Sequence, residues 1–202
     1  MSANEYYDAI GEVLAYALSA EDFIYGQNET EKGIGFRIIR ENHGVDLTAE
    51  PNSRFFRIEY EYRLSNQLYN AYENDVDLLR GAIERYDIDE NEIGDTDLSY
   101  EAAYQRIEDI DDEEAERIVE RVISYVTSTD CRWELLTLNR ESTDAGPIWD
   151  GIQVVRLIYP YEDGFGPRDY ERAVQDAISV GKEIQSNMSR RMDAIQEIGG
   201  GQ

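Results

Sequence analysis

The chain has 202 residues and is 41% hydrophobic, which is enough apolar material for one sizeable core or two small ones. Its 44 acidic residues outnumber 19 basic ones and give a formal net charge of -25. Such a charge repels phosphates and anionic lipids, so we expect neither nucleic acid nor a membrane as a partner. The single cysteine, Cys131, excludes an intrachain disulfide and any metal site made of thiolates.

The first part of the chain predicts a helix followed by strands. Apolar residues recur at helical spacing over 4–18, a short edge strand is predicted over 22–28, and a second strand is predicted over 33–40. The sequence NHG at 42–44 predicts the start of a loop that continues to Asn52.

The clearest periodic signal is RFFRIEYEYRL at 54–64. Apolar and charged residues alternate there, so one face of this strand should be dry and the other charged. The dry face would carry Phe56, Ile58, Tyr60, Tyr62 and Leu64. Residues 57, 59, 61 and 63 would point outward, and this strand would form the centre of the sheet.

The second part of the chain predicts helices around a hairpin. Ser65 is positioned to cap a helix that continues to Tyr86, and an acidic stretch follows at 87–98. The remaining predicted elements are helices over 100–107 and 112–126, a hairpin of strands over 131–140 and 151–159 with a loop through 145–147, and a long final helix opened by Pro167.

Together these elements predict an α+β fold, with an antiparallel sheet of about five strands and long amphipathic helices packed on one face. We expect a single domain over 1–198, in which two related halves would join near 87–98. Residues 199–202 would form a disordered tail.

Two stretches of the sequence have loosely similar patterns, and each joins a strand to a helix. They are RIEYEYRLSNQLYNAY and VVRLIYPYEDGFGPRDYERAV. The order of elements is a helix, three strands, a helix, a helical insert, two strands and a helix. This order resembles the fold of type III secretion chaperones and of the related YbjN-like proteins. The helices predicted over 100–126 depart from that pattern. The resemblance implies a chaperone-like fold.

Motifs for catalysis or cofactor binding fail at their defining positions. The acidic stretch at 87–98 has Glu92 where a calcium loop needs glycine, and Leu98 where it needs glutamate. The glycines at 164 and 166 lack the third small residue of a dinucleotide fingerprint. No spacing joins His43 and Cys131 into a nucleophilic pair. We therefore expect no bound cofactor or metal.

Arginines are concentrated in the predicted strands, although the chain as a whole is strongly acidic. One interpretation is a lattice of cross-strand Arg and Glu pairs, each worth at most about 1 kcal/mol. The other is a docking face for an acidic partner segment or a small anion. The candidate partner-binding residues are Arg37, Arg57, Arg63, Arg132 and Arg156.

The use of charged residues also indicates an environment. The chain has two lysines against seventeen arginines, beneath a coat of carboxylates. This composition resembles that of proteins from extreme halophiles, which implies a salt-accumulating archaeon or one of its viruses as the source. The N-terminus lacks the pattern of a signal peptide, and no long apolar run occurs, so we expect a cytoplasmic protein.

The sequence is compatible with two functions. The first is a non-enzymatic adaptor or chaperone-like interaction module that forms a homodimer. The second is an enzyme or small-molecule-binding protein whose site the sequence does not reveal. A deep apolar cleft with converging polar groups would favour the second, and a flat exposed sheet would favour the first.

Overall fold

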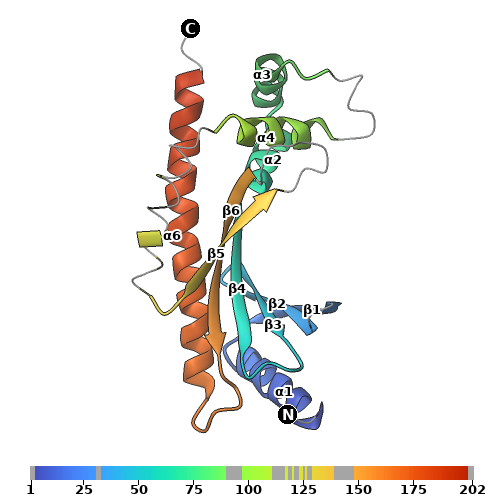
Figure 1. Cartoon of the computed structure of the whole chain (residues 1–202), viewed down its shortest axis with the longest axis vertical. Helices are drawn as coiled ribbons and strands as arrows, with labels where there is room; N and C mark the ends of the chain where they lie inside the picture. Colours follow the sequence, from blue (N-terminus) through green and yellow to red (C-terminus); the bar gives the residue numbers. More distant parts are fainter. Residues whose placement is uncertain are drawn as a thin grey trace. The chain divides into compact units, whose positions relative to one another are not determined.

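The computed structural model describes residues 3–30, 33–89, 97–110, 117, 120, 123–124, 126, 129–138 and 148–199 (Figure 1). Its helices are α1 (Ala3–Ser19), α2 (Leu64–Asn74), α3 (Val76–Tyr86), α4 (Leu98–Glu108) and α6 (Pro167–Gly199). Its strands are β1 (Phe23–Thr30), β2 (Gly33–Arg40), β3 (His43–Ala49), β4 (Phe56–Arg63), β5 (Arg132–Leu138) and β6 (Ile148–Ile158).

The strands form one antiparallel sheet in the order β1-β2-β3-β4-β6-β5. The α+β prediction is therefore confirmed, with six strands in place of about five. The predicted edge strand is present as β1, and the predicted hairpin partners β5 and β6 are neighbours. The hairpin loop at 145–147 and most of the predicted helix at 112–126 lie outside the described residues.

The chain folds into two compact units, each made of separate segments. The first unit comprises Met1–Glu61, Val122–Glu134 and Gln153–Gln202, and the second comprises Tyr62–Arg121 and Leu135–Ile152. Both flanks of the acidic stretch at 87–98 belong to the second unit, and the tail beyond Gly199 lies outside the described residues. In the described part of the chain, no helix is both long enough and apolar enough to cross a membrane.

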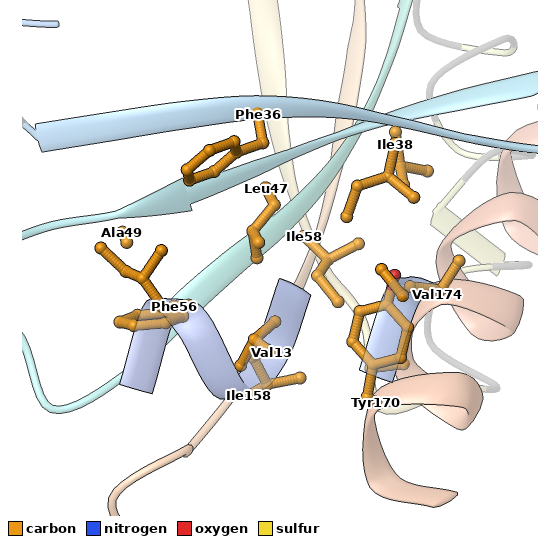
Figure 2. Close-up of a cluster of buried hydrophobic side chains, with 14 of the residues drawn as sticks. Val13, Phe36, Ile38, Leu47, Ala49, Phe56, Ile58, Ile158, Tyr170 and Val174 are labelled. Carbon is orange, nitrogen blue, oxygen red and sulfur yellow. The ribbon is translucent and has the colours of Figure 1, made fainter. Parts of the chain in front are cut away.

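In the first unit, α1 and α6 cover one face of the sheet. Figure 2 shows Leu47 and Ile58 pointing from the strands toward Val13 of α1 and Tyr170 of α6. Phe56 and Ile58 are fully buried, as the alternation in β4 predicted, so hydrophobic burial fixes which face of this strand is dry. Pro167 opens α6, which also confirms the prediction for the longest helix.

The loop predicted from residue 42 to residue 52 is wrong over most of its length, because His43–Ala49 forms β3. Glu41 and Asn42 both adopt positive φ, at 50° and 68°, and form a two-residue turn that reverses the chain at once. Val45, Leu47 and Ala49 then alternate into the core. The polar turn residues concealed this short period-2 pattern.

The single helix predicted from Ser65 to Tyr86 is two helices. The backbone is extended at Asp75, whose side chain accepts hydrogen bonds from the N–H groups of Asp77 and Leu78 and so caps α3. Continuous apolar spacing on both sides of Asp75 hid this break. The predicted cap is also wrong, because α2 begins at Leu64 and the hydroxyl of Ser65 instead contacts Asp150.

Tyr60 of β4 lies directly against the backbone of α6 at Gly181. A methyl group added at Gly181 would lie 2.4 Å from Cδ1 of Tyr60. We expect Gly181→Ala to destabilise the protein by about 1 kcal/mol or more, because displacing the ring costs more than the gain in helix propensity. Chemical denaturation at fixed salt measures this change.

Gly11 in α1 provides the matched control, because no atom lies within 4 Å of a methyl group added there. Gly11→Ala is expected to stabilise the protein by about 0.5–1 kcal/mol through reduced freedom of the unfolded chain. Equal stabilisation by both substitutions would contradict the close approach of Tyr60 to α6.

Candidate functional site

The candidate site is the outer face of the first unit's sheet, defined as the face opposite α1 and α6. The strand register places Tyr25, Arg37, Asp46 and Glu59 in one row across β1 to β4. Phe23 and Ile39 form a second row beside it. Because side chains alternate along a strand, all of these residues lie opposite the buried face that holds Ile38 and Leu47.

One end of the outer face is apolar and exposed. Phe23 and Tyr25 on the edge strand β1 are 71% and 64% exposed, and they lie beside the half-buried Ile39. We call these three residues the aromatic corner. A bulge at Gly26, whose φ is 54°, shifts the register of β1 just beyond them, and pairing with β2 then continues to Thr30.

The rest of the outer face carries ion pairs within the chain. Arg37 contacts Asp46 on the neighbouring strand, and Arg57 contacts Glu59 as well as Glu134 of β5, the latter at 3.1 Å. Burial raises the pKa of both Asp46 and Glu59, and the adjacent guanidinium groups oppose that rise. The contacts of Arg37 with Asp46 and of Arg57 with Glu134 join different strands, as the predicted ion-pair lattice requires, whereas Arg57 and Glu59 both lie on β4.

The other predicted arginines have different surroundings. Arg156 approaches Asp176 of α6 at 3.7 Å and Asp130 at 3.3 Å, so its side chain lies on the face that α6 covers. Arg132 is exposed and forms no ion pair with any described residue. Their role in partner binding stays a prediction.

Arg63 belongs to the second unit, where it contacts the fully buried Asp150 at 2.9 Å. Asp150 also accepts hydrogen bonds from the backbone N–H of Ser65 at 2.9 Å and from its hydroxyl at 3.0 Å. These bonds satisfy a donor at the start of α2 and explain the position of the carboxylate. Asp150 lies eighty-five residues from Ser65, so sequence spacing offered no signal for this cluster.

A second buried cluster lies in the first unit. The carboxylate of Asp22 has no exposed side-chain surface and accepts two hydrogen bonds from Arg40, at 2.7 and 2.8 Å. The hydroxyl of Tyr170 in α6 donates to the same carboxylate at 2.9 Å. Burial and the Asp22 charge raise the pKa of Tyr170. The cluster joins the β1–β2 edge to α6.

Three open hollows lie among the described residues of the first unit, and charged side chains contribute to the lining of each. One of about 590 Å³ is lined by Glu5, Asp8, Glu12 and Arg54, among others. Among the residues that the structure describes, no group of three or more His, Cys, Asp or Glu is arranged to hold a metal ion. Burial raises the pKa of the Cys131 thiol, which disfavours the reactive thiolate.

No family model and no curated protein matches the chain. Among solved structures, the chain is similar to the crystal structure of an uncharacterized protein from Methanothermobacter thermautotrophicus. The two chains are 10% identical with a TM-score of 0.56, and the match covers 89% of this chain and 96% of that chain. At this level of identity, the likeness shows a shared fold.

Proposed function

We propose that this protein is a non-enzymatic, chaperone-like interaction module of a halophilic cytoplasm, and that it binds protein partners through the outer face. The observation that carries the proposal is the aromatic corner, where Phe23 and Tyr25 are 71% and 64% exposed on an edge strand. Exposed aromatic side chains gathered at one place mark surfaces that bind other proteins. The open, charged hollows of the first unit favour this function over small-molecule catalysis.

The absence of charged residues from the first part of β1 also supports partner binding at this surface. Residues 23–28, FIYGQN, contain no charged side chain, in a chain where 31% of residues are charged. Natural edge strands are commonly protected by charged side chains, especially lysine, or by proline, because their unpaired N–H and C=O groups can recruit another strand. At β1, aromatic residues take the place of such charges before the bulge. The strand is therefore suited to pairing with a partner strand.

We propose a second copy of the chain as one such partner, which makes the protein a homodimer. Two copies with a net charge of -25 each repel one another, and the uncharged part of β1 allows contact without bringing carboxylates together. In molar salt the Debye length is only about 3 Å, so repulsion between the remaining surfaces is screened. The predicted element order that resembles type III secretion chaperones has three strands between its first two helices, whereas the structure has four strands between α1 and α2, so the chaperone-like assignment rests on the aromatic corner.

Acidic partner segments would meet the arginines of the outer face. Arg37 lies beside Tyr25 and is half exposed, so a partner carboxylate could replace or share its contact with Asp46. Long-range attraction is screened in brine, and such binding depends on close guanidinium to carboxylate hydrogen bonds. Arg132 offers a further exposed guanidinium on β5.

The proposal is tested by replacing both aromatic residues of the corner, as Phe23→Ser with Tyr25→Ser. We expect the wild type to sediment as a dimer in 2 M potassium chloride, and this double variant to sediment as a monomer. Loss of two buried aromatic contacts on each side removes roughly 3–6 kcal/mol of apolar burial per copy. Analytical ultracentrifugation over a range of protein concentrations measures the change.

Tyr7→Ser is the control, since Tyr7 is 60% exposed in the same unit but lies on α1, away from the outer face. Circular dichroism must show that all variants are folded. Dimers that persist in the double variant would contradict pairing at β1. If affinity capture from a halophile lysate also recovered the same proteins with and without the aromatic corner, the docking surface itself would be wrong.

A further inference from the structure

A second surface of the first unit concentrates positive charge. An open hollow of about 590 Å³ lies between the end of α1, the end of β2 and the first turns of α6. We call it the arginine hollow. It is lined by Ala20, Arg40, Arg168, Glu171, Arg172 and Gln175. Three guanidinium groups and one carboxylate line this hollow, and further carboxylates lie beside two of the guanidiniums, namely Asp22 beside Arg40 and Asp130 and Asp176 beside Arg172.

Arg40 supplies a fixed guanidinium at the base of this hollow. Its Nε and Nη2 atoms are held by the buried carboxylate of Asp22, and its side chain is only 15% exposed. The remaining nitrogen, Nη1, makes one long hydrogen bond of 3.4 Å to the backbone carbonyl of Glu171. Asp22 balances the charge of Arg40, but Nη1 keeps donor capacity in a defined position.

Arg168 and Arg172 supply exposed charge at the rim. They are four residues apart on α6 and therefore lie on the same side of the helix. Arg168 is exposed and has no ion-pair partner among the described residues. Arg172 approaches Asp130 and Asp176 only at 3.6 and 3.8 Å, which is too long for a hydrogen bond.

The number of available donors indicates the class of ligand. One carboxylate is satisfied by the two parallel N–H groups of a single guanidinium. Donors from three guanidiniums, approaching from β2 and from two turns of α6, instead match an anion whose oxygens point in three or more directions. The first turn of α6 adds the positive end of a helix dipole near Arg168.

We propose that the arginine hollow binds a phosphate group, in which Arg40 anchors one oxygen and Arg168 and Arg172 close over the others. This proposal is independent of the function assigned to the outer face. The phosphate could belong to free inorganic phosphate or to a small phosphate ester, since both present the same tetrahedral oxygens.

The test is isothermal titration of the whole protein with potassium phosphate in 2 M potassium chloride, with the counter-titration of buffer subtracted. We expect saturable binding at one site per chain. Arg168→Gln and Arg172→Gln should each weaken binding roughly tenfold, the usual effect of losing a hydrogen bond to a charged group. Arg54→Gln is the matched control, because Arg54 is exposed in the same unit but lines a different hollow, and its binding should equal that of the wild type.

Parallel titrations with glycerol phosphate and potassium acetate identify the ligand class. Tighter binding of glycerol phosphate would assign the site to a phosphate ester, and equal binding would assign it to the free anion. Acetate binding as tight as that of phosphate would overturn the proposal. So would the absence of saturable phosphate binding, or variants at 168 and 172 that bind as the wild type does while circular dichroism shows them folded.

Discussion

Asp22→Asn is expected to destabilise the protein by about 3–5 kcal/mol, because it removes one partner of a buried ion pair. The carboxylate of Asp22 is fully buried and accepts hydrogen bonds from two nitrogens of Arg40 and from the hydroxyl of Tyr170. An amide at this position leaves the Arg40 charge without compensation and turns an NH₂ group toward other donors. Urea denaturation in 2 M potassium chloride measures the loss.

Two other substitutions show how the cost of losing the buried ion pair compares with that of losing a single hydroxyl group or an exposed ion pair. Tyr170→Phe removes only the hydroxyl, and it should cost about 1–2 kcal/mol since Asp22 and Arg40 remain paired. Arg37→Gln breaks an ion pair whose side chains are 48% and 43% exposed, and it should cost less than about 1 kcal/mol. If Asp22→Asn cost no more than Arg37→Gln, the cluster would not hold the β1–β2 edge to α6.

The cluster of Asp22, Arg40 and Tyr170 could not be predicted from local sequence patterns. Alternation in residues 54–64 predicted the buried face of β4 correctly, because burial of Phe56 and Ile58 imposes a local period on the sequence. Nothing local relates Asp22 to Tyr170, which lies 148 residues away. Contacts of this kind depend on how helices and strands pack together, and they leave no periodic pattern in a single sequence.

The predicted group of partner-binding arginines shows the same limitation of local sequence patterns. Alternation assigns a residue to one side of its own strand, but the packing of α6 decides which side becomes the covered face. Arg156 was therefore grouped with Arg57, although it contacts Asp176 on α6 while Arg57 contacts Glu134 on β5. The aromatic corner was missed for a related reason. An edge strand was predicted over 22–28, but the sequence does not show that Phe23 and Tyr25 lie on the face opposite α1 and α6, which the register with β2 determines.

The melting temperature is expected to rise by roughly 10 °C or more between dilute buffer and 2 M potassium chloride, because a few kcal/mol shifts the midpoint of a chain of this size by that amount. Even if every basic residue neutralised one acid, a net charge of -25 would remain to repel itself in the compact state. The Debye length falls from about 30 Å at 0.01 M to about 3 Å at 1 M, so salt removes most of this repulsion.

Salt also weakens the attraction within ion pairs. Whether the melting temperature rises or falls with salt therefore depends on whether the screened repulsion is larger than the screened attraction. Exposed pairs such as Arg37 with Asp46 contribute less than about 1 kcal/mol each, so little stability is lost when they are screened. The buried Asp22–Arg40 pair is shielded from ions and should keep its contribution. Thermal melts followed by circular dichroism in potassium chloride and in sodium chloride should rise together, as screening by monovalent ions requires. A melting temperature that stayed flat across both series would remove the basis for a halophilic protein, since carboxylate repulsion would then not limit its stability.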